Sequence, residues 1–212
     1  MIVTLTTAAH AQSRIDRLQP LVAVSAKRLA IAERVALAKW DRGTAVEDAN
    51  REAQVVRAAV ASAKENIQLS LLRAGLGARW TAACEIRSQN GLTRYRYAKD
   101  YDAVVAVRVD SVERCFALEY ERSAKAKKDY LAIADLLDQE KQLSHLLYLA
   151  SNHDVLSYLR GVFRPTPVSL WFGIVRDWHA QLLSMPVADA SSSLPQPLYE
   201  ALELPRFGLR AS

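Results

Sequence analysis

The sequence predicts a mixed α/β domain preceded by a long antiparallel helical hairpin, and three observations lead to this prediction. Apolar residues recur at heptad spacing through most of the first 75 residues. After residue 76, short apolar segments alternate with amphipathic ones. Half of the 212 residues are hydrophobic, which suffices for one core and a smaller accessory unit. We therefore predict a helical hairpin over 1–75, an α/β domain over 76–185 and an extended tail over 186–212.

The predicted hairpin consists of two helices joined by a short turn. One heptad series runs over 15–36 and a second over 46–67. Between them, Gly43 ends the first helix, and Thr44 with Glu47 forms a capping box for the second. The seams of this coiled coil are rich in alanine and bury little area, so the hairpin needs another surface, which a homodimer or the rest of the chain would supply. A support without chemistry and a direct role in DNA binding both remain open.

The α/β domain is predicted as a helix, three antiparallel strands, and then alternating helices and strands. The pattern favours a short helix over 78–89 and a strand over 92–97, followed by strands over 101–109 and 114–122. A helix near 124–142, a strand over 145–151, a helix over 153–163 and a strand over 168–175 complete the order. This order predicts a mixed sheet flanked by helices.

Three carboxylates are expected to gather at the open end of the second strand pair. With residues 110–113 as a four-residue loop, Asp102 faces Glu121 and Val104 faces Glu119. Alternate residues return to the same face, so the three acids project from one side. Like charges this close need a cation or another partner, and hard oxygen ligands suit Mg²⁺ or Mn²⁺. A plain solvated face is the alternative.

These residues resemble the PD-(D/E)xK nuclease superfamily, closest to plasmid replication-relaxation proteins and transposon-end nuclease subunits. The resemblance rests on Glu85 in a helix, Asp102 in "YDAVV", and Glu119 with Glu121 in "ALEYE" before a basic helix start. It implies a metal-dependent DNA endonuclease, a hydrolase of mobile-element or plasmid replication and transfer. Asp102, Glu119 and Glu85 would hold Mg²⁺ or Mn²⁺. The sequence departs from the superfamily pattern, because Glu121 stands where the lysine is expected and Tyr101, not proline, precedes the aspartate.

Lys125 is the candidate that replaces the missing lysine. If Ser123 caps the next helix, Lys125 lies in its first turn and can orient water or the scissile phosphate, with Glu121 assisting. The alternative is a catalytically inactive nuclease-like fold that binds DNA or a protein partner.

The charge of the chain favours an acidic partner, and DNA is the one expected. The net charge is +5 and the pI is 9.3, and residues 76–130 carry 11 basic and 8 acidic side chains. The side chains expected to contact nucleic acid, unless they are ordinary solubility charges, are Arg79, Arg96, Lys125, Lys127 and Lys128.

Other sequence features exclude some classes of site and favour a cytoplasmic protein without a membrane partner. Two cysteines and four histidines show no zinc-binding spacing. The sequence lacks an apolar run of membrane-spanning length and a signal-peptide pattern at its start. The tail mixes Pro and Ser with a short apolar patch, so we expect it to be extended and to dock on a protein partner.

Overall fold

The computed structural model describes residues 49–76, 78–93, 96–190 and 194–206, together with 27, 30–32, 34–35, 38 and 41. The chain divides into two units, residues 1–55 and 56–212. The second predicted helix is present as α2 (Ala49–Arg73). Most of the first predicted helix and the turn with Gly43 and Thr44 lie outside the described residues, so the hairpin itself stays a prediction.

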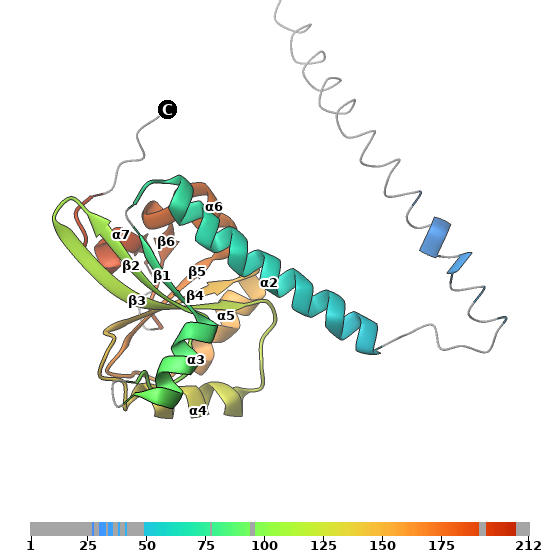
Figure 1. Ribbon diagram of the computed structural model, residues 1–212, viewed down its shortest axis with the longest axis horizontal. Coiled ribbons are helices and arrows are strands. Elements are labelled where there is room, and N and C mark those ends of the chain that lie inside the picture. The colour runs from blue at the N-terminus through green and yellow to red at the C-terminus, as the bar shows by residue number, and fades with distance from the viewer. Residues whose placement is uncertain are drawn as a thin grey trace, which may run out of the picture. The chain divides into compact units, whose positions relative to one another are not determined.

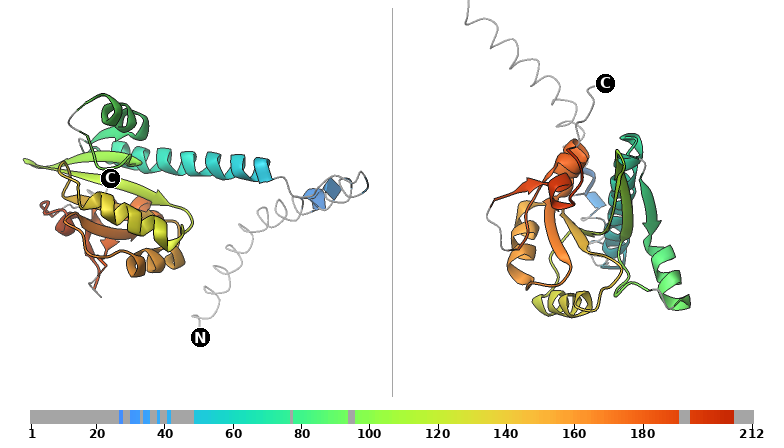
Figure 2. Two further views of the ribbon diagram at one scale, coloured as in Figure 1. Left: turned by 90° about the horizontal axis from the view of Figure 1, so that it is seen from below. Right: turned by 90° about the vertical axis from the view of Figure 1, so that its left-hand side faces the viewer.

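The second unit contains a five-stranded mixed sheet, which confirms the predicted α/β class (Figures 1 and 2). The strands follow chain order across the sheet: β1 (Arg79–Ala82), β2 (Ala103–Val109), β3 (Val112–Glu121), β4 (His145–Ala150) and β5 (Ser169–Ile174). The first three strands are antiparallel, and β3, β4 and β5 are parallel. Parallel strands must be covered on both faces, which explains their continuous apolar sequences.

Helices cover both faces of the sheet. The last eighteen residues of α2 fall in the second unit, and Ile67 and Leu71 pack on one face with α6 (Val175–Gln181) and α7 (Leu198–Ala201). The other face is covered by α3 (Ala83–Leu92), α4 (Lys127–Leu137) and α5 (His153–Val162). Within the described part of the chain, no helix combines the length and the apolar composition needed to cross a membrane.

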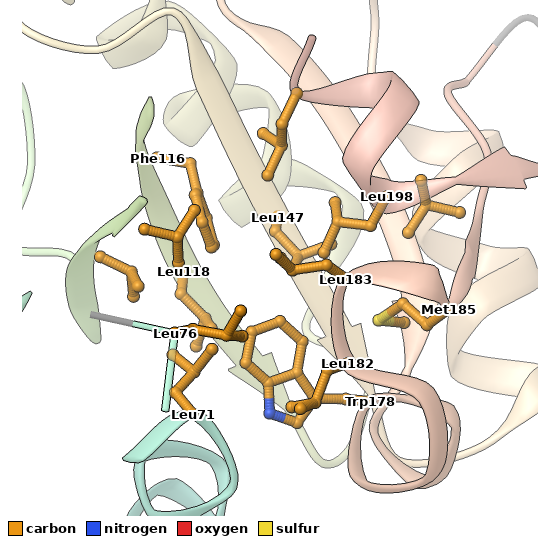
Figure 3. Close-up of a cluster of buried hydrophobic side chains, with 14 of the residues drawn as sticks. Leu71, Leu76, Phe116, Leu118, Leu147, Trp178, Leu182, Leu183, Met185 and Leu198 are labelled. Atoms are coloured by element: carbon orange, nitrogen blue, oxygen red, sulfur yellow. The ribbon is translucent and has the colours of Figure 1, made fainter. Parts of the chain in front are cut away.

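Trp178 is the centre of the core on the α2 face. Its side chain is fully buried, and Figure 3 shows it among Leu71, Leu76 and Leu182. The indole N–H donates a hydrogen bond of 3.2 Å to the carbonyl of Ile67, so the polar end of the ring is satisfied. Trp178 therefore joins α2 to α6, as expected for a core residue.

Aromatic rings form the core on the other face. Tyr148 on β4 and Phe172 on β5 stack with ring centroids 5.8 Å apart, and Phe163 packs against both. Tyr130 of α4 contacts Phe163 edge to face at 5.4 Å. Offset and edge-to-face pairs of this kind add stability beyond the area they bury.

The first strand of the sheet differs from the prediction. Residues 79–82 form β1 and the helix begins only at Ala83, whereas the described residues of 92–97 are not a strand. Side chains take the place of a strand partner there: Tyr97 N–H donates to Asn90 Oδ1 (2.8 Å), and Ala98 N–H donates to Glu140 Oε2 (2.9 Å). The pattern of apolar and polar residues does not show that side chains will accept hydrogen bonds from these backbone N–H groups, so a strand was predicted instead.

The turn between β2 and β3 is also tighter than predicted. Val109 pairs with Val112, so the loop has two residues, and Asp110 adopts a positive φ of 53°. Such short turns favour residues that tolerate positive φ, as Asp does. Ala103 pairs with Leu118, and continuing this register places Asp102 opposite Glu119, not Glu121. The shift is two residues, so Glu119 and Glu121 keep their predicted face.

Two further expectations require correction. Helix α4 begins at Lys127 after Ala126 as N-cap, so Ser123 does not cap it and Lys125 precedes its first turn. Residues 186–206, predicted to be extended, include the short strands β6 (Pro186–Val187) and β7 (Gln196–Pro197) as well as α7. Leu198 and Leu202 are fully buried in the core on the α2 face, because burial of the apolar residues outweighs the Pro and Ser content.

Candidate functional site: a charged edge of the sheet

The three predicted carboxylates lie at one edge of the sheet. Glu119 and Glu121 lie at the carboxyl end of β3, and Asp102 directly precedes β2, which is antiparallel to β3. The parallel strands β4 and β5 also end at this edge. In open α/β sheets, ligands bind outside the carboxyl ends of the parallel strands.

Each carboxylate is paired with a lysine from a different part of the chain. Lys64 of α2 contacts Asp102 at 2.5 Å, Lys99 contacts Glu119, and Lys125 contacts Glu121 at 2.7 Å. We call these six residues the charged edge. No group of three or more His, Cys, Asp or Glu within the described ranges is arranged to hold a metal ion, and each of the three carboxylates has a lysine as its ion-pair partner. The side chains as arranged therefore do not fit the expected Mg²⁺ or Mn²⁺.

Glu119 is the most perturbed acid of the charged edge. Burial raises the pKa of its carboxyl group, the positive charge of Lys99 opposes this shift, and the negative charge of Asp102 adds to it. The backbone N–H of Asp102 also donates to Glu119 Oε1 at 3.3 Å. Glu119 thus needs Lys99 to remain ionised at low energetic cost.

In two of the three pairs the lysine is clearly the more exposed member. Side-chain exposure is 33% for Lys64 against 19% for Asp102, and 47% for Lys125 against 8% for Glu121. Lys99 and Glu119 are both nearly buried, at 12% and 10%. A ligand that approaches Asp102 or Glu121 from solvent therefore meets the paired ammonium group before the carboxylate.

Three tyrosines surround the buried acids. The Tyr148 hydroxyl is buried without a hydrogen-bond partner in the described structure, and the charges of Glu119 and Glu121 contribute to its raised pKa after burial itself. Tyr130 OH accepts the backbone N–H of Lys125 at 3.0 Å, and burial raises its pKa to about 12. Tyr101 OH donates to Glu140 Oε2 at 2.8 Å. These hydroxyl groups stay protonated at neutral pH.

The remaining predicted site residues lie elsewhere. Glu85 is exposed, and its Oε2 accepts the N–H of Ala82 at 2.8 Å, which caps its own helix. The basic residues predicted to contact DNA, all exposed, lie at the start of β1, in the loop before β2 and around the start of α4: Arg79, Arg96, Lys125, Lys127 and Lys128.

Sequence analysis did not identify Lys64, Lys99 or Tyr148. Lys99 precedes Asp102 in "AKDYD", which is a weak signal of a charged segment. The partner of Lys64 is 38 residues away in the sequence, and pattern alone does not indicate such a pair.

One protein-family comparison gives a match. The family model of chorismate mutase type II matches residues 13–77, which is 65 of the 212 residues. No curated protein and no solved structure matches the chain. The matched segment includes α2 and therefore Lys64.

This match corrects the resemblance inferred from the sequence. The assignment to the PD-(D/E)xK nucleases was wrong, since the matching family is that of chorismate mutase type II. The two functions inferred from that assignment, a metal-dependent endonuclease and an inactive module that binds DNA or a protein partner, are therefore wrong as well. The short acidic motif was too degenerate to identify a family, and lysines pair with the acids on which it rested.

Proposed function

We propose that the charged edge binds a small organic dianion through the ammonium groups of Lys64, Lys99 and Lys125. The observation that carries this proposal is the exposure of the lysines relative to the carboxylates behind them. At the carboxyl ends of the parallel strands, the ammonium groups of Lys64 and Lys125 lie toward solvent with their paired acids behind them, while Lys99 is nearly buried with Glu119. Two ligand carboxylates would form charge-assisted hydrogen bonds with them.

Chorismate is the first ligand to test. The family that matches residues 13–77 is named for a reaction of chorismate, which is an organic dicarboxylate, and Lys64 lies within the match. Rearrangement of bound chorismate is therefore a second candidate function, because the matched family is named as a mutase.

Glu119 would balance the charge when the ligand binds. In the free protein each lysine is neutralised by an acid, so an added dianion gives the site excess negative charge. Burial already raises the pKa of Glu119, and a ligand carboxylate on Lys99 would raise it further until Glu119 takes up a proton. Dianion binding should therefore strengthen as pH falls through the raised pKa of Glu119.

Calorimetric titration with chorismate tests the proposal. Lys125→Met should weaken binding at least tenfold, since a charged hydrogen bond is worth about 1.5–3 kcal/mol. Lys128→Met removes the same charge from an exposed site on α4 outside the charged edge, and should change affinity less than about twofold. Consumption of chorismate, followed by loss of its diene absorbance, tests the second candidate.

The proposal fails if chorismate does not bind at up to about 1 mM, the upper end of common substrate affinities. It also fails if Lys125→Met and Lys128→Met weaken binding equally, because general electrostatic attraction would then explain the result.

Titration with Mn²⁺ tests the metal site that the sequence predicts. A metal held by Asp102 and Glu119 would have to displace the lysines, and its binding would weaken as pH falls. Saturable Mn²⁺ binding lost in Asp102→Asn would replace the dianion proposal.

A further inference from the structure

A polar cleft lies beside the charged edge. It has a volume of about 950 Å³, within the range of small-molecule sites. Its walls are the loop that precedes β2 and the end of α4 with the turn that follows, and it is lined in part by Asn90, Arg96, Lys99, Asp100, Asp138 and Lys141. Most of its lining residues carry charged or amide side chains, so its ligand should be polar.

The charges of the cleft are unbalanced. Asp138 pairs with Arg164 at 2.6 Å, a guanidinium that it shares with Asp135 (2.7 Å), and Asp100 pairs with Arg87 at 3.4 Å; neither arginine lines the cleft. Arg96 and Lys141, both exposed, form no ion pair with any residue that the structure describes. Both acids of the cleft thus have cationic partners outside it, and Arg96 and Lys141 are left for a ligand.

Glu140 fixes the two walls of the cleft relative to each other. Its buried carboxylate accepts Tyr101 O–H (2.8 Å) and Ala98 N–H (2.9 Å) from one wall. It also accepts Gln142 N–H (2.7 Å) from the other. Three hydrogen bonds to one buried carboxylate hold both walls in place, so a ligand would not have to order them.

We propose that the polar cleft binds a small phosphorylated molecule, with its phosphate held by Arg96 and Lys141. A guanidinium group binds two phosphate oxygens at once, and an ammonium group that lines the same cleft compensates the second negative charge. The volume leaves room for the organic part of the ligand beside the amide and carboxylate of Asn90 and Asp100. This inference does not depend on dianion binding at the charged edge, although Lys99 contributes to both sites.

Calorimetric titration of the full chain with glucose 6-phosphate, inorganic phosphate and glucose tests the inference. We expect saturable binding of the two phosphate probes, tighter for the ester, and no binding of glucose. Arg96→Gln and Lys141→Gln should each weaken binding of the ester at least tenfold. Both side chains are exposed, so the fold should persist, which circular dichroism would verify.

Two control variants separate this site from others. Lys127→Gln removes an exposed lysine that does not line the cleft and should change affinity less than twofold. Lys125→Met disrupts the charged edge and should leave ester binding intact, even if chorismate binding is lost or was never present. Absence of saturable phosphate binding overturns the inference, as does an equal loss in Arg96→Gln and Lys127→Gln. Binding of a duplex oligonucleotide at the same salt concentration, with weak or no ester binding, would also overturn it.

Discussion

Lys99→Met is the substitution that tests most directly how the charged edge is stabilised. The pair of Lys99 and Glu119 is almost fully buried, with 12% and 10% of the side chains exposed. Removing one partner of a buried ion pair leaves the other charge uncompensated, which typically costs about 3–5 kcal/mol. For a chain of this length such a loss lowers the melting temperature by roughly 6–20 °C.

The cost should depend on pH because Glu119 can escape it by taking up a proton. Burial raises the pKa of Glu119 in the folded state above its value of 4.5 in the unfolded chain. Its contribution to stability is therefore greatest below pH 4.5 and is lost as pH rises through the folded-state pKa. Lys99→Met raises that pKa further, so the variant should lose stability over a wider range toward neutral pH. Glu119→Gln should remove this component of the pH dependence.

Urea unfolding between pH 4.5 and 8 measures these effects. The double variant Lys99→Met with Glu119→Gln should recover much of the stability that Lys99→Met loses at pH 7, because no buried charge remains. Arg108→Met is the matched control, since its pair with Glu113 is exposed and should be worth less than about 1 kcal/mol. A loss in Lys99→Met no larger than in Arg108→Met, or one independent of pH, would refute the argument.

Three further substitutions test other parts of the fold by the same unfolding measurement. Asn152→Ala removes the side chain that accepts Val155 N–H at the start of α5 and should cost about 1 kcal/mol; Asn152→Ser should cost less. Gly75→Ala forces a side chain into a φ of +63° after α2 and should also cost about 1 kcal/mol. Trp178→Phe keeps an aromatic ring but removes the hydrogen bond to Ile67, so it should cost less than Trp178→Ala, for which about 3–5 kcal/mol is expected. Equal losses in both Trp178 variants would contradict a packing role for the ring.

The strands β2 to β5 were predictable because their sequences favour a buried strand over a helix or a loop. Strands β2 to β5 are continuous or alternating apolar segments, rich in β-branched and aromatic residues and bounded by turns. Strand β1 has only four residues, "RWTA", and a helix follows it directly. The sequence pattern therefore predicted one helix over both segments. Its position depends on pairing with β2, which is more than twenty residues later in the chain.

The site was predictable only in part, and for a physical reason. The acids follow strand periodicity, so Glu119 and Glu121 could be placed on one face of β3 from their spacing. The lysines follow no such rule. Lys64 and Lys99 reach their partners across 38 and 20 residues of sequence, from a helix and a loop whose positions depend on the packed fold. A cluster of acids whose partners are unknown resembles the acidic motif of a nuclease, and this explains the incorrect family assignment.

A charge reversal separates the two roles of the lysines, stabilisation and ligand binding. Glu121→Lys combined with Lys125→Glu keeps one ion pair but exchanges its members. The carboxylate then stands at position 125, where the parent side chain is 47% exposed, and the ammonium at position 121, where the parent side chain is 8% exposed. Because the ion pair itself is retained, stability should stay within about 2 kcal/mol of the parent. Dianion binding should nevertheless fall at least as far as in Lys125→Met, because a ligand from solvent then meets negative charge first. If the reversed pair binds chorismate as tightly as the parent does, the order of charges toward solvent does not govern binding, and the proposal loses its main support.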